Sequence, residues 1–142
     1  MKSFICTACG TVGTFIAAAL GGWDTAIIAL LVFMVIDYVT GLLVAGVFHK
    51  SKKSETGGLE SRAGFKGLVR KCMVLLLVVV ANLLDQQIGA SYIRDAVCIG
   101  FMVNELLSIV ENASLMGLPI PAAITKALDI LAEKQEANHE QP

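Results

Sequence analysis

Four apolar stretches separated by short polar segments dominate the hydrophobic pattern of the chain. They cover approximately residues 4–22, 25–48, 67–87 and 94–112. The second stretch runs from Ala26 to Phe48 with Asp37 as its one ionisable residue. As a helix it would be roughly 34 Å long, which is enough to cross a hydrocarbon core of about 30 Å. The pattern therefore predicts an all-α, polytopic integral membrane protein with about four transmembrane helices.

The first stretch is rich in Gly, Ala and Thr. Three of its small residues recur every four positions and would form a face suited to close helix packing: Gly13, Ala17 and Gly21. Lys2 and the alanines at 17–19 are also typical of a secretory signal peptide, so a retained span and a cleaved signal both stay open. Residues 21–24 then predict a tight turn, in which Asp24 can cap the next helix.

Asp37 lies at the midpoint of the second stretch. An aspartate at that depth costs on the order of 2.5 to 3.5 kcal/mol, so we expect it to face protein or water. Gly41 and Ala45 follow at intervals of four and share one helical stripe with Asp37. The stripe is predicted to be helix-packing or pore-facing. The alternative is that Asp37 only bonds a neighbouring helix within one subunit.

The fourth stretch is less apolar than the others. One predicted helical face combines small and polar side chains, namely Gly100, Asn104, Ser108 and Glu111, and is widened by Glu105 and Asn112. Lipid cannot surround such a helix, so this face is also predicted to be helix-packing or pore-facing. An interfacial amphipathic helix remains the alternative.

Positive charge is concentrated in and just after one loop. Seven of the eleven Lys and Arg residues lie there: Lys50, Lys52, Lys53, Arg62, Lys66, Arg70 and Lys71. A basic loop at 49–66 strongly prefers the cytoplasmic side, which places both termini in the cytoplasm. Arg70 and Lys71 are expected to snorkel toward that side, whereas Asp85 is expected at the outer surface.

The composition and the tail complete this picture. With 56% hydrophobic residues the chain is too apolar for a soluble domain, and a net charge of −1 does not imply nucleic acid. Residues 1–117 are predicted to form the transmembrane domain and 118–142 a cytoplasmic tail. In the tail, four apolar residues mark one face of a short amphipathic helix: Ile124, Ala127, Leu128 and Leu131. Residues from 133 onward are polar and are expected to fray.

Catalytic machinery is not apparent in the sequence. There is no nucleophile with a nearby base and no phosphate-binding Gly loop, so we expect neither an enzyme nor a cofactor. Cys6 and Cys9 form a C-x-x-C without a second pair or a nearby His, so we expect no metal or redox site there. A chain this small could form a hole only by oligomerising.

Five short motifs follow one another at defined spacing. They are Gly21-Gly22-Trp23-Asp24, Asp37-Tyr38-Val39-Thr40-Gly41, Gly64-Phe65-Lys66-Gly67-Leu68, the segment 104–112, and Gly117-Leu118-Pro119-Ile120-Pro121. Together they resemble the toxin secretion/phage lysis holin family, which comprises phage holins of the type also found beside clostridial toxin loci. The resemblance extends from about residue 21 to residue 131.

This resemblance implies a protein that oligomerises in the bacterial host cytoplasmic membrane and permeabilises it, which releases an endolysin to the cell wall. The implied partners are further copies of the chain, the lipid bilayer, an endolysin and, as an additional candidate, an antiholin. Two other functions fit the same pattern. One is a small four-helix transporter, and the other is an antiholin-like regulator that inserts without permeabilising the membrane.

Overall fold

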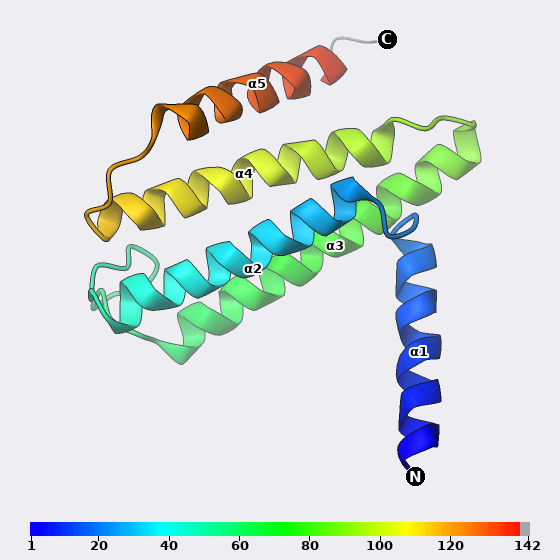
Figure 1. Cartoon of the computed structure of the whole chain (residues 1–142), viewed down its shortest axis with the longest axis horizontal. Helices are drawn as coiled ribbons and strands as arrows, with labels where there is room; N and C mark the ends of the chain where they lie inside the picture. Colours follow the sequence, from blue (N-terminus) through cyan, green and yellow to red (C-terminus); the bar gives the residue numbers. More distant parts are fainter. Residues whose placement is uncertain (140–142) are drawn as a thin grey trace.

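The computed structural model describes residues 1–139, which form five helices and no strand (Figure 1). In chain order the helices are α1 (Lys2–Ala19), α2 (Thr25–Gly46), α3 (Ser61–Ile88), α4 (Ile93–Leu115) and α5 (Ala122–His139). The all-α prediction is therefore confirmed. Asp24 caps α2 as expected, because its carboxylate accepts a hydrogen bond from the Ile27 backbone N–H at 3.1 Å.

Helices α2, α3 and α4 lie side by side as a bundle, and α1 projects away from one end of it (Figure 1). α2 and α4 run in the same direction, and α3 runs opposite to both. α2 packs most closely against α4, while α5 packs along α4. The core of the bundle consists of apolar side chains from three helices and the α1–α2 turn: Leu20, Ile27, Leu30, Met34, Val74, Val78, Cys98 and Met102.

Within the described residues, three helices are long and apolar enough to cross a membrane, namely α1, α2 and α3. α4 is not among them and carries four charged residues, Arg94, Asp95, Glu105 and Glu111. The predicted fourth span thus stays a prediction. α3 begins at Ser61, so the loop is shorter than the predicted 49–66. Arg62 and Lys66, which were expected in that loop, lie on the first turns of α3.

The tail forms a longer helix than the short one expected from its pattern. Of the four apolar positions on the predicted face, Leu128 is buried, Leu131 is half-buried, and Ile124 and Ala127 are exposed. α5 continues through much of the segment expected to fray and ends at His139. The remainder of that segment, residues 140–142, lies outside the described residues.

Candidate functional site: two buried polar clusters

A group of polar side chains, which we call the central cluster, joins α2, α3 and α4 inside the bundle. Its members are Asp37, Thr40, Lys71, Glu105 and Asn112. The Lys71 ammonium on α3 donates to Asp37 Oδ2 on α2 at 2.7 Å and to Glu105 Oε2 on α4 at 2.6 Å. The side chain of Lys71 is 13% exposed, that of Asp37 6% and that of Glu105 7%. The cluster therefore connects all three helices through nearly buried charges.

Asn112 completes the central cluster from α4. Its Nδ2 donates to Asp37 Oδ1 at 3.2 Å, to the Asp37 carbonyl at 3.3 Å and to Thr40 Oγ1 at 2.9 Å. Gly41 lies one turn on, and a side chain there would approach the Asn112 amide. The Asn112 amide thus reaches the α2 backbone at Asp37, and a Cβ at Gly41 would be in ordinary van der Waals contact with it.

The charges of the central cluster are not balanced when all its groups are ionised. Two carboxylates, Asp37 and Glu105, face one ammonium, Lys71, which leaves a formal charge of −1. An unpaired charge inside an apolar bundle is costly, and water is the better environment for it. Hydrogen bonds thus keep the three charged groups inside the subunit, although the excess negative charge would have a lower free energy in water.

A second group, the Arg94 clamp, closes the end of the bundle near the α1–α2 turn. Its members are Arg94, Asp24, Asp85 and Asn82. The buried Arg94 guanidinium donates to both carboxylate oxygens of Asp24, at 2.6 and 3.0 Å, and to the carbonyl of Leu20. The bidentate geometry fixes the turn relative to α4.

The other members of the clamp join α3 to the same end of the bundle. Asp85 accepts hydrogen bonds from the backbone N–H groups of Ile93 and Arg94 at 3.0 and 2.9 Å, so it caps the start of α4 from α3. Asn82 Nδ2 donates to the carbonyl of Ala19 at the end of α1. Asp85 is therefore buried within the subunit at the end of the bundle opposite the basic loop, and its expected position at the outer surface of the membrane stays a prediction.

Gly21 makes the Arg94 clamp possible. Its φ of +87° is a conformation that favours glycine, and a Cβ built there would lie 2.6 Å from Arg94 Nε and 2.7 Å from Asn82 Oδ1. No side chain larger than hydrogen fits without displacing the clamp. Gly21 was predicted to be part of a helix-packing face, but the structure places it in the turn beneath Arg94.

The Arg94 guanidinium also sets the charge state of the turn. Its hydrogen bonds lower the pKa of Asp24 below the usual range, and the backbone N–H of Ile27 adds to this effect. Asp24 is thereby kept ionised at every physiological pH. The pair of Asp24 and Arg94 therefore does not act as a switch near neutral pH.

The structure separates the predicted site residues of α2 and α4 into two groups. Asp37, Ala45 and Glu105 are buried, and Gly41, Gly100 and Ser108 are half-buried. Asn104 and Glu111 are exposed, so they do not share the buried face with Glu105. Glu111 instead pairs with Lys52 of the basic loop at 3.0 Å. The buried polar side chains of α4 are Arg94, at its start, and Glu105 and Asn112, which lie one residue along the chain from Asn104 and Glu111.

The small-residue face predicted for α1 is used only at its end. Ala17 is buried, whereas Gly13 is half-buried and has open space where a side chain would point. Cys6 and Cys9 are exposed free thiols on the same helix. Most of α1 therefore lacks an intramolecular neighbour in the described chain.

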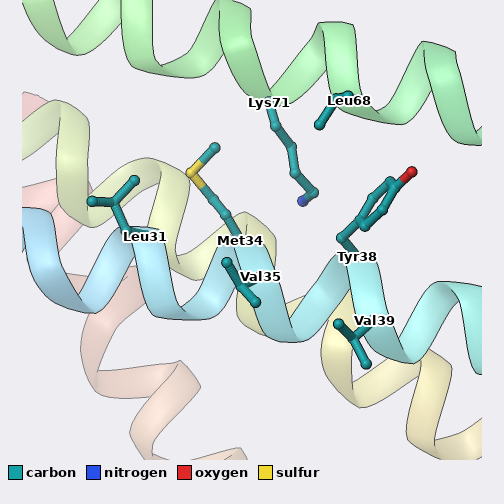
Figure 2. A pocket seen from close by; sticks show the side chains of 7 residues that line it. All are labelled: Leu31, Met34, Val35, Tyr38, Val39, Leu68 and Lys71. Atoms are coloured by element: carbon teal, nitrogen blue, oxygen red, sulfur yellow. The ribbon is translucent and has the colours of Figure 1, made fainter. Parts of the chain in front are cut away.

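Of the seven basic residues in and just after the loop, all but Lys71 are exposed, and their cytoplasmic location stays a prediction. The six exposed residues are Lys50, Lys52, Lys53, Arg62, Lys66 and Arg70. Lys71 differs from the expected snorkelling side chain, because it reaches from α3 toward α2 into the bundle (Figure 2). Two carboxylates within hydrogen-bonding distance hold its ammonium there in place of water.

Sequence reasoning missed the Arg94 clamp altogether. A signal was present, because Arg94 is an isolated arginine at the end opposite the basic loop, where the distribution of positive charge leaves it without an obvious role. Since α2 and α4 begin at the same end of an alternating bundle, Asp24 was the available partner. The pairing of Arg94 with Asp24 could thus have been inferred, whereas the contribution of Asp85 could not.

Comparison with known proteins agrees with these features. The model of the bacteriophage holin family matches residues 14–133. An uncharacterised protein of Halalkalibacterium halodurans is 38% identical over 117 residues, which cover 78% of this chain and 81% of that protein. A protein of Bacillus phage phi105 named "probable holin" is 33% identical over 112 residues, which cover 78% and 77% of the two chains.

A further relative is an uncharacterised 14.9 kDa protein from the nagH 3′ region of Clostridium perfringens, 34% identical over 88% of this chain and 90% of that protein. No solved structure matches the chain. The family match spans most of the sequence and includes both buried clusters. With its long apolar helices and its extensive match to the family model, the chain belongs to the bacteriophage holin family and is a membrane protein.

Proposed function

We propose that this chain is a holin that oligomerises in the bacterial cytoplasmic membrane and permeabilises it, so that an endolysin reaches the cell wall. Family membership supports the holin role, as does the similarity to the phage protein named "probable holin". The observation that carries the proposal is the central cluster, in which Asp37, Lys71 and Glu105 are enclosed by helices with apolar outer faces. Both termini are proposed to be cytoplasmic.

The enclosed charges provide a physical route from a closed subunit to a wetted opening. In the isolated subunit, Lys71 satisfies Asp37 and Glu105, and the outward surfaces of α2 and α3 are apolar. In a large assembly, neighbouring copies could replace lipid around these helices and allow them to rotate. Rotation would bring the three charges to a shared aqueous lumen, where hydration replaces their costly confinement.

The membrane potential gives this transition a trigger. Moving one charge across the full potential is worth about 2.3 kcal/mol per 100 mV, so displacement of a cluster with a formal charge of −1 couples opening to the field. If opening moves the cluster toward the cytoplasmic side, which is negative at rest, local depolarisation by a first lesion would favour further openings. This coupling accounts for an abrupt event without any catalytic group.

Induced expression in a bacterium that carries a cytosolic endolysin without a signal sequence tests the proposal. Membrane potential and culture turbidity are recorded together, with matched cultures that lack the endolysin. Abrupt depolarisation, followed by lysis only when the endolysin is present, is the expected result. It would establish lesions large enough for a protein.

Other outcomes would favour the alternative functions. Depolarisation without endolysin-dependent lysis would indicate small pores or a transporter-like leak. Membrane insertion without depolarisation would indicate an antiholin-like regulator, and the proposed permeabilising function would then be wrong. An immunoblot of the membrane fraction is needed to distinguish a silent protein from an absent one.

A further inference from the structure

The two faces of α1 differ in the size of their side chains. One face carries bulky apolar residues, all of them exposed: Phe4, Ile5, Val12, Phe15 and Ile16. The opposite face carries small residues such as Gly10, Gly13 and Ala17, and only the last of these is buried. Hydroxyl groups on α1 bond back to their own helix, as Thr7, Thr11 and Thr14 show. The bulky face therefore forms a ridge without polar groups that need a partner.

The bundle presents a groove of complementary character between α2 and α3. The groove has a volume of about 220 Å³, and apolar or aromatic side chains line it: Leu31, Met34, Val35, Tyr38, Val39 and Leu68 (Figure 2). A cavity of about 150 Å³ can hold a benzene molecule, so a phenylalanine ring fits a space of this size. The groove opens on the outer surface of the bundle, as the exposure of Val35 and Val39 shows.

Charge indicates what the groove can accept. Lys71 alone is charged among the described residues that line it, and its ammonium is already held by Asp37 and Glu105. An anionic headgroup would have to compete with two carboxylates at 2.7 and 2.6 Å. An uncharged apolar ridge faces no such competition. α1 fits this requirement, because it has no ionisable side chain after Lys2 apart from its two thiols.

The geometry of the turn prevents α1 from filling the groove of its own subunit. Asn82 holds the end of α1 by the carbonyl of Ala19, and Arg94 holds the turn by the carbonyl of Leu20. From that end α1 projects away from the bundle (Figure 1). The groove lies near Leu68 and Lys71 on α3, and Asn82 is eleven residues beyond Lys71, or roughly 16 Å along the helix. A second copy is therefore the available acceptor.

We infer that the ridge of α1 in one copy docks into the α2–α3 groove of the next copy. Each copy then offers one ridge and one groove, so the contact is heterologous and repeats into rings or open chains. Packing of the ridge into the groove supplies the attraction, because lipid tails provide no hydrophobic driving force between helices. This inference rests on the proposed oligomerising function and names the surfaces that perform it.

Matching depths in the membrane identify the pair of residues to test. Phe15 is thirteen residues from Lys2 at the start of α1, and Val35 is eleven residues from Gly46 at the end of α2. If both of these helix ends are on the cytoplasmic side and both helices cross the membrane, the two side chains lie roughly 20 and 17 Å from that side along their own helix axes. Phe15 and Val35 are both well exposed in the subunit, at 75% and 62%.

Cysteine cross-linking between two differently tagged copies tests the contact. All four native cysteines are replaced by serine, one copy receives Phe15→Cys, and the other receives Val35→Cys. Both are expressed together, and membranes are oxidised before any depolarisation occurs. The expected result is a mixed disulfide dimer as the main product, with few dimers of either copy alone. Dimers formed only through Phe15→Cys would overturn the inference in favour of paired α1 helices.

A filled groove provides the second measurement. Val39→Trp, added to the copy with Val35→Cys, should fill the groove and abolish the mixed dimer. Val80→Trp is the matched control, since Val80 is similarly exposed on α3 but does not line the groove, and it should leave the dimer unchanged. Absence of any dimer without these blocks, in copies shown to be inserted, would mean that the inference is wrong.

The outcome can be separated from that of the proposed function. If mixed dimers form but the membrane never depolarises, the contact between ridge and groove is supported and the proposed permeabilisation is wrong. If lysis proceeds normally while the mixed dimer is absent, the contact between ridge and groove is wrong and the holin function is supported.

Discussion

Replacement of Lys71 by methionine should make the protein trigger early. The substitution keeps a long, flexible side chain but removes the ammonium that Asp37 and Glu105 share. Two nearly buried carboxylates then face each other without a counterion in the closed subunit. In a wetted assembly the same carboxylates are hydrated, so the loss falls mainly on the closed state.

The size of the effect follows from the burial of the three side chains. Removal of one partner from a buried ion pair costs about 3 to 5 kcal/mol. At about 1.4 kcal/mol per tenfold change, even the lower figure shifts the closed-to-open ratio roughly a hundredfold. Glu105→Gln should act in the opposite direction. It removes the excess negative charge and leaves the pair of Lys71 and Asp37 intact, so the closed state is favoured and lysis is delayed.

The assay is the interval between induction and depolarisation at matched protein abundance. An exposed pair offers the control, because Lys52 and Glu111 are 3.0 Å apart with side chains 70% and 55% exposed. Exposed pairs contribute about 0 to 1 kcal/mol, so Lys52→Met should change the interval little. Immunoblots of membrane fractions ensure that early triggering is compared at equal amounts of inserted protein.

Two results would refute this reasoning. One is an equal shift for Lys71→Met and Lys52→Met, which would mean that burial of the central cluster has no effect on opening. The other is a shift in the same direction for Lys71→Met and Glu105→Gln, which would mean that the charge balance of the cluster does not determine the closed state.

Three further predictions concern stability of the purified protein in detergent, measured by thermal unfolding. Asn112→Ala should lower stability by about 1 to 3 kcal/mol because it removes a buried donor from the central cluster, whereas Asn104→Ala, at an exposed position on the same helix, should be nearly neutral. Gly21→Ala should destabilise the protein more than Gly22→Ala, because both glycines have positive φ but only Gly21 has no space for a methyl group. Equal losses of stability would mean that the methyl group at position 21 does not clash with the Arg94 clamp. Because the pKa of Asp24 is lowered in the folded protein, its contribution is present at neutral pH and is lost only as the pH falls below about 4. The difference in melting temperature between wild type and Asp24→Asn should therefore be constant from pH 5 to 8 and shrink in acid, and a difference that changes near neutral pH would contradict this assignment.

The helices could be predicted from the sequence because each is encoded locally. The run around Asp37 is long and apolar, and the Gly-Gly-Trp-Asp turn ends one helix and caps the next, so the bounds of α2 follow from neighbouring residues. Asp37 could also be identified as a residue that needs polar company, since the cost of an aspartate in an apolar run does not depend on the fold. The motif pattern alone was sufficient to indicate the holin family.

The partners of those residues depend on tertiary structure. Lys71 follows a basic loop and ends a run of charges, so a snorkelling side chain was the natural expectation from sequence. Only the antiparallel placement of α3 brings its ammonium between Asp37 and Glu105. The same holds for the face of α4. Helical periodicity allowed a face centred on Asn104 as readily as one containing Glu105 and Asn112, and packing against α2 selected the latter.

The sequence by itself thus determined that this protein is helical, that it is apolar enough for a membrane, and that its apolar segments contain acidic residues such as Asp37 and Glu105. The tertiary structure decided how those acids are neutralised, that Arg94 and Asp85 fasten one end of the bundle, and that α1 is left with a free apolar ridge. The physical reason is the distance along the chain over which the two kinds of interaction act. Helix formation and insertion depend on residues within a few turns, whereas ion pairs across three helices depend on the relative rotation of whole helices.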